Sequence, residues 1–365
     1  MRKWIGVFCL GIGLAGAVEL PPELEALFRQ RGARGPGQDA TPLATFTVKA
    51  TPVQGQGKQL VPVFDRKFAN FGDASFSGNG QWLAVQHKQL QLIEVEGKRT
   101  RSWPVKSAQS LNPGPGGSVV FDTDRPTLAS FAVPPKALTR EEEYTICSGA
   151  NGQLLLTDRS HLYDVQGRRK VKALAGRYLS GHTGTMSDDG RTVAFFKNDH
   201  ASTFGQDHGY TSVVELARNR ELMGFDNGTY ENAVALDEHA NWVAEGRADI
   251  DPVTNEEGEL IEEGTKGEGG VFLFRRVDGA FRPAARWFPE ESPNSLAFCR
   301  SRPWLAVALG KRVCLWTVPK GKMVAQFDAG DAVSRIAVSP ALMVLVCTAS
   351  GRVTLLDASK LTAPD

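Results

Sequence analysis

Cysteine is scarce in this chain of 365 residues, which contains only five. Four of them lie beyond the N-terminal region, at Cys147, Cys299, Cys314 and Cys347, with irregular spacing and no C-x-x-C pair. That spacing predicts neither a zinc finger nor a dithiol redox motif. Each lies in or beside an apolar run typical of a β-strand, so we expect buried free thiols, with disulfide pairing as the alternative in an exported protein.

An excess of charge of either sign is also missing. The 42 Lys and Arg residues and 41 Asp and Glu residues leave a net charge of +1. Nucleic acid binding needs a concentrated Lys/Arg surface, so we expect no nucleic acid partner. Common catalytic motifs are absent as well: there is no G-x-S-x-G, no H-E-x-x-H and no phosphate-binding glycine loop. A binding protein is therefore expected before an enzyme, and no cofactor is expected.

The N-terminus has the three parts of a secretory signal peptide. Arg2 and Lys3 are followed by an apolar run over residues 4–14 and by the small residues 15–17. The uncharged stretch is shorter than the roughly 20 residues of a bilayer span, although an uncleaved anchor is the alternative. We predict a signal peptide over 1–17, a secreted or periplasmic protein that does not span the membrane after cleavage, and a mobile leader over 18–57.

The rest of the chain, 58–365, repeats one cassette and is predicted to be a single domain. The cassette is an alternating strand, a Ser/Asp/Asn/Gly turn, a more continuous apolar strand and two further strands. Its clearest copy spans residues 74–98, and copies at 183–196 and 294–327 follow the same order. Looser copies begin near Ala108, Thr145, Asn232 and Ala332. Most starts are roughly 35 to 40 residues apart, the length of a four-stranded propeller blade.

Seven starts predict an all-β fold, a seven-bladed β-propeller of four-stranded antiparallel blades. The last copy has only three strands, and residues 59–65 can supply the fourth and close the ring. Pro62 suits an outer edge strand, where its missing N–H costs nothing. We expect the closed ring to be monomeric on its own.

The chain resembles the WD-repeat (WD40-like) propeller family, whose blades follow F-S-x-D/N-G-x-x-L-A-V and then L-W-D. The pattern appears in segments 76–80, 186–190 and 315–322. Thr317 replaces the usual Asp, and Gly181-His182 is the only candidate for the family's Gly-His dipeptide. The resemblance implies that the connections between second and third strands open on the same face as the links between blades.

Two long inserts interrupt the repeat at that position, in the adjacent fourth and fifth copies. We predict a protein partner there, because exposed aromatic residues anchor interfaces and clustered charge steers encounter. The candidate contact residues are Phe204, Tyr210, Glu256, Glu257, Glu259, Glu262 and Glu263. The function predicted from the sequence is thus an exported binding or assembly platform.

The alternative is a metal-dependent propeller hydrolase or lyase that uses the same inserts. Two Asp-His elements suit zinc, and an Asp-x-Asp element resembles part of a calcium loop. The candidate ligands are Asp199, His200, Asp207, His208, Asp249 and Asp251. A solvated polar loop is the simpler interpretation of both segments, and a purely structural envelope protein would need neither.

Overall fold

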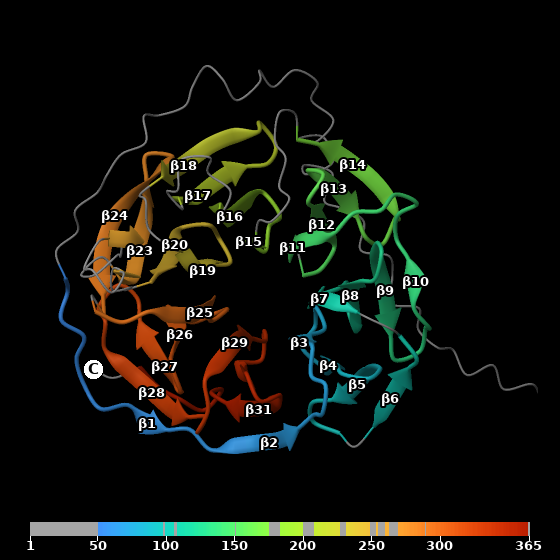
Figure 1. The fold of residues 1–365 in the computed structure, drawn as a ribbon, viewed down its shortest axis with the longest axis horizontal. Coiled ribbons are helices and arrows are strands. Elements are labelled where there is room, and N and C mark those ends of the chain that lie inside the picture. The colour runs from blue at the N-terminus through green and yellow to red at the C-terminus, as the bar shows by residue number, and fades with distance from the viewer. Residues whose placement is uncertain are drawn as a thin grey trace, which may run out of the picture.

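The fold is all-β in a computed structural model that describes residues 50–97, 99–105, 108–149, 151–174, 183–199, 208–226, 231–248, 253–254, 260–262, 269–288 and 290–363. Seven sheets, each with four antiparallel strands in succession, stand around a central axis (Figure 1). No helix occurs within these ranges. The predicted seven-bladed propeller is therefore confirmed.

Each blade runs from an inner strand at the axis to an outer strand at the rim. Blade one contains β3 (Asp73–Phe76), β4 (Trp82–Gln86), β5 (Leu90–Glu94) and β6 (Thr100–Trp103). Blade two contains β7 (Gln109–Pro113), β8 (Ser118–Asp122), β9 (Pro126–Ser130) and β10 (Lys136–Ala137). Blade three contains β11 (Thr145–Gly149), β12 (Leu154–Thr157), β13 (His161–Asp164) and β14 (Arg169–Ala173). Blade four contains β15 (Thr183–Met186), β16 (Thr192–Asp199), β17 (His208–Glu215) and β18 (Arg220–Asp226). Blade five contains β19 (Glu231–Leu236), β20 (Trp242–Arg247), β23 (Gly270–Val277) and β24 (Ala280–Trp287). Blade six contains β25 (Pro293–Phe298), β26 (Trp304–Leu309), β27 (Arg312–Thr317) and β28 (Met323–Asp328). Blade seven contains β29 (Val333–Val338), β30 (Met343–Thr348), β31 (Arg352–Asp357) and β2 (Pro62–Lys67).

The repeated turn motif has a direct structural reason. In blade one the hydroxyl of Ser77 accepts a hydrogen bond from the backbone N–H of Trp82 across the turn, at 3.1 Å. Ser187 and Ser339 receive the equivalent N–H at the same distance in blades four and seven. The serine thus satisfies a backbone donor where the first strand turns into the second, and Gly80 takes the positive φ that the turn requires.

Hydrophobic packing between neighbouring blades forms the core. Second strands such as β4 and β26 are buried along their whole length, because each is covered by a blade on both faces. Buried side chains gather into seven clusters, and each cluster combines residues of two adjacent blades. The core is therefore a ring of seven interfaces, and each blade depends on its two neighbours.

An N-terminal strand closes the ring, as predicted. β2 pairs antiparallel with β31 and completes blade seven (Figure 1). The strand begins later than the predicted range 59–65, because Gln59 belongs to the two-residue strand β1 (Lys58–Gln59). β1 pairs in parallel with β28 of blade six instead.

Residues 50–67, here named the belt, extend this contact around the rim. Ala50 bridges Arg286 on the outer strand of blade five, and Gln54 bridges Lys322 beside the outer strand of blade six. Leu60, which is 5% exposed, packs into the cluster between blades six and seven. The belt therefore contacts the outer edges of three consecutive blades before the chain enters blade one.

The four cysteines of the propeller are buried free thiols, as expected, and none forms a disulfide. Burial raises the pKa of Cys314 to about 11 and those of Cys299 and Cys347 to about 12. No helix of the described residues is long and apolar enough to cross a membrane.

Candidate functional site

The two inserts leave the same end of neighbouring blades. We name this end the insert face: it carries the connections between second and third strands and the links from one blade to the next, and the opposite end is the turn face. In blade four the β16–β17 pairing continues to Asp199 opposite His208. In blade five the short hairpin of β21 (Val253–Thr254) and β22 (Leu260–Glu262) lies in the chain between β20 and β23. The predicted position of both inserts is confirmed.

Most predicted contact and ligand residues lie outside the described residues. These are Phe204, Glu256, Glu257, Glu259 and Glu263 of the partner set, and His200, Asp207, Asp249 and Asp251 of the metal set. Asp199, His208, Tyr210 and Glu262 lie in described strands, but only their backbones are described. Register places Asp199 opposite His208 and Tyr210 opposite Lys197. Both sets therefore remain predictions.

A central channel follows the propeller axis and is lined by the seven inner strands. It encloses about 650 Å³, and its lining combines hydroxyl, amide and charged groups with small and large apolar side chains. Arg335 on β29 reaches from blade seven to the carboxylate of Asp73 on β3 and donates to the carbonyl of Leu111 on β7 at 3.0 Å. Asp73 also accepts from the N–H of Leu111 at 2.8 Å. This network ties blades seven, one and two together at the channel wall.

Turns of several blades contact one another at the turn face. A Cβ on Gly78 would lie 2.3 Å from the carbonyl oxygen of Gly114, so only glycine fits where the turns of blades one and two meet. Arg300 of blade six pairs with Asp188 of blade four and donates to the side chain of Asn151 in blade three at 2.7 Å. These contacts connect blades that are not adjacent, so the turn face is braced across the axis.

Buried carboxylates tie blades two and three together at the insert face. Asp122, at the end of β8, is fully buried and accepts from both the N–H and the hydroxyl of Thr145, at 2.7 Å each. Thr145 begins β11, so this carboxylate fixes where the inner strand of blade three starts. Desolvation raises the pKa of Asp122 to about 6, against the lowering effect of the Thr145 hydrogen bonds.

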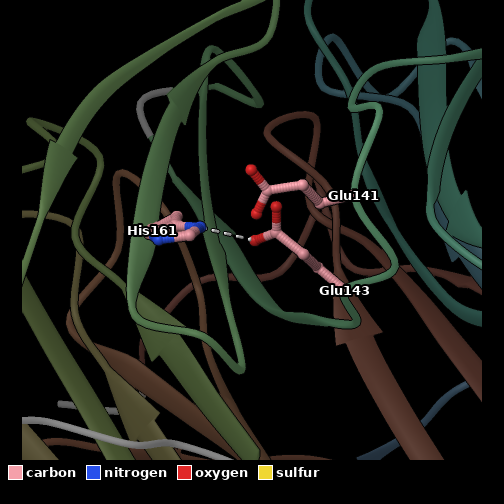
Figure 2. Close-up of side chains that lie close together, drawn as sticks. All are labelled: Glu141, Glu143 and His161. Carbon is pink, nitrogen blue, oxygen red and sulfur yellow. Dashed lines mark hydrogen bonds and ion pairs between the residues drawn. The ribbon is translucent and has the colours of Figure 1, made fainter.

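A second buried carboxylate, Glu143, lies on the link that leads into β11. Its side chain has no exposed surface and accepts from the hydroxyls of Thr157 and Tyr163, at 2.5 Å each. The Nδ1 atom of His161 is 3.0 Å from Oε2 of Glu143 (Figure 2). Burial, followed by the hydrogen bond to Glu143, raises the pKa of Tyr163.

Glu141 completes a group of three potential metal ligands. Its carboxylate faces that of Glu143, and one ligand atom each of Glu141, Glu143 and His161 lies within 4.8 Å of the others (Figure 2). Arg159 approaches the exposed side of Glu141 at 3.8 Å. Within the part of the chain that the structure describes, this is the one such three-ligand group.

No sequence motif predicts this cluster. His161 is 18 residues from Glu143, and they meet because the link into β11 returns to the start of β13. The run Glu141-Glu142-Glu143 directly before the inner strand of the third copy was an available signal. It was not enough, because charge runs at strand boundaries are usually solvated.

Comparison with known proteins supports the fold. No family model and no curated protein sequence matches the chain. The chain is similar to one in the crystal structure of the mitotic checkpoint complex, with a TM-score of 0.61 and 12% identity over 87% of this chain and 99% of that one. It is also similar to one of the Kuenenia stuttgartiensis hydrazine synthase, with a TM-score of 0.59 and 11% identity over 85% of this chain and 100% of that one. At these identities the likeness shows a shared fold.

Proposed function

We propose that this chain is an exported, WD-repeat-like propeller that serves as a protein-binding or assembly platform, with the insert face as its contact surface. The observation that carries the proposal is the pair of extensions in blades four and five, which leave adjacent blades at the same end. Loops on a rigid scaffold are the usual carriers of binding function, because they vary without loss of the core.

The architecture supports such a role in two further ways. The braced turn face and the seven inter-blade clusters hold the insert face at fixed geometry, which lowers the entropy cost of binding. One of the similar chains comes from a structure of a complex, the mitotic checkpoint complex. Export rests on the sequence of residues 1–17, with its basic start, apolar run and small-residue end.

The test removes both extensions while keeping the blades. Residues 200–207 and 249–268 are each replaced by a short Gly-Ser turn, and proteins co-purifying with this variant are compared with those of the intact chain. The expected result is loss of specific partners with an unchanged melting temperature, because the replacement keeps every described residue of the seven buried clusters. The change Lys320→Glu, on the opposite face, is the matched control and should keep every partner. If the double replacement retained them all, the insert face would not be the contact surface.

A further inference from the structure

The group formed by Glu141, Glu143 and His161 has the composition of a small metal site outside the two inserts. Glu141 and Glu143 lie on the link into blade three, and His161 begins the third strand of that blade. Figure 2 shows the two carboxylates facing each other, with the imidazole ring of His161 directed at Glu143. All three therefore converge at the insert face, on a different blade from either insert.

Two carboxylates meet at this position, and their combined negative charge favours a bound cation. The side chain of Glu143 is fully buried, and among the described residues its ion-pair partner is His161. A buried carboxylate is costly unless a positive charge or a set of hydrogen bonds compensates it. Two facing carboxylates also repel each other, and Arg159 approaches only Glu141, from the solvent side at 3.8 Å.

The geometry around Glu143 is that of an oriented ligand. Tyr163 donates to Oε1 and Thr157 donates to Oε2, so the carboxylate plane is held by two hydroxyls from the body of the blade. Carboxylates that bind metals are characteristically hydrogen-bonded in this way. The 3.0 Å separation between Nδ1 of His161 and Oε2 of Glu143 matches two ligands of one ion. With bonds of about 2.0–2.2 Å, such atoms lie roughly 3 Å apart.

We propose that His161, Glu143 and Glu141 bind a divalent transition-metal ion of the zinc class. One imidazole and two carboxylates form a set that suits zinc rather than magnesium, which favours oxygen ligands and retains its waters. The ion would fasten the link that carries Glu141 and Tyr144 to the third strand of blade three. Tyr144 lies on this link and is 49% exposed, so the ion would hold in place the backbone beside an exposed aromatic residue of the insert face.

Lys170 supplies the competing arrangement. Its ammonium lies 3.5 Å from Nε2 of His161, at the outer limit of a hydrogen bond. In that arrangement a neutral ring accepts from Lys170 and donates from Nδ1 to Glu143, without a metal. Lys170 is exposed, so it is free to move away when a metal displaces the Nδ1 proton. Metal binding therefore distinguishes the two arrangements: the first predicts uptake of a metal ion, and the second predicts none.

The experiment titrates the EDTA-treated, full propeller with Zn²⁺ by calorimetry and with Co²⁺ by visible absorption, using Mg²⁺ for comparison. We expect one Zn²⁺ per chain, a Co²⁺ spectrum with d–d bands of a protein-bound ion, and a Zn²⁺-dependent rise in melting temperature. Glu141→Gln and His161→Gln should each weaken Zn²⁺ binding by at least about tenfold. Because Glu141 is exposed, its variant should fold normally even if the His161 variant does not.

Two control variants separate this site from other binders. His239→Gln removes another imidazole beside a glutamate, with Nε2 3.3 Å from Glu238, but that pair belongs to no three-ligand group in the described residues. It should leave Zn²⁺ affinity unchanged. The double change Asp199→Asn and His208→Asn tests the blade-four insert. Loss of binding only in that double variant would overturn the proposal, as would intact Zn²⁺ affinity in Glu141→Gln and His161→Gln or no Zn²⁺ uptake at all.

Discussion

The carboxyl group of Asp122 makes the stability of the ring depend on pH. Its pKa is about 6 in the folded protein, above the 3.8 of an aspartate in an unfolded chain, so folding favours the protonated form. The stabilisation is complete below pH 3.8 and is lost as pH rises through about 6. This difference in pKa corresponds to a change of about 3 kcal/mol in the free energy of unfolding between pH below 3.8 and pH above 6.

Asp122→Asn removes this titration and keeps both contacts. The amide oxygen accepts from the N–H of Thr145, and the amide NH₂ donates to its hydroxyl. From pH 4 to pH 7, urea unfolding should therefore show the variant gaining about 2–3 kcal/mol relative to the parent. Asp124→Asn is the matched control: Arg125 holds the pKa of exposed Asp124 at about 2, so this group titrates mainly below pH 4 and its variant should follow the parent from pH 4 to pH 7. A parallel pH dependence in parent and Asp122→Asn would rule out this role for Asp122.

Some side-chain contacts could be predicted from the sequence and others could not. Ser77 and Ser187 were predictable, because a local turn motif sets their hydrogen bonds. Glu143 and His161 were not, because their contact depends on how a link packs against a strand 18 positions away. A lone histidine and a charge run carry no periodic signal of that contact.

The belt is held to the rim by few but well-buried side chains. Leu60 is 5% exposed, whereas its neighbour Val61 is 73% exposed. Leu60→Ala should lower the free energy of unfolding by about 2–5 kcal/mol, because it opens a cavity between blades six and seven. Val61→Ala, the matched control, should change it by less than about 0.5 kcal/mol. Chemical denaturation measures both, and equal effects would show that the belt is not anchored at Leu60.

Removal of β2 tests ring closure as a whole. Deleting residues 59–65 should greatly weaken folding, because blade seven would lose four of the six residues of its outer strand β2 and most of the β31 edge would open. Trimming residues 19–38 should be nearly neutral. Melting temperatures of the two truncations give the comparison, and a similar loss in both would contradict the closing role of β2.

Blade number and strand order were predictable at the scale of elements, because each blade repeats the same alternation and turn. The belt was only partly predictable. Residues 59–65 were recognised by their strand-like pattern, but Ala50 and Gln54 make isolated bridges that follow no such pattern. Their contacts depend on the rim that the folded blades create.

At the scale of the whole molecule, closure couples all seven interfaces. Cys147, Cys299, Cys314 and Cys347 report on blades three, six and seven, and all are buried. With Cys9→Ser to remove the remaining thiol, labelling of all four should proceed at one common rate under native conditions, that of global opening. Added reductant should leave the melting temperature unchanged. Much faster labelling of Cys314 than of Cys347 would show instead that blades open one at a time.

The path of the belt also determines how the molecule would respond to a mechanical pull on its N-terminal side. Tension would first detach Ala50 and Gln54, then β1, while every blade keeps its four strands. Extending residues 50–61 would release roughly 40 Å of chain before β2 bears load. Only the next step would shear β2 from β31 and open the ring. A partner tethered through this end could therefore be displaced over several nanometres while the propeller stays closed.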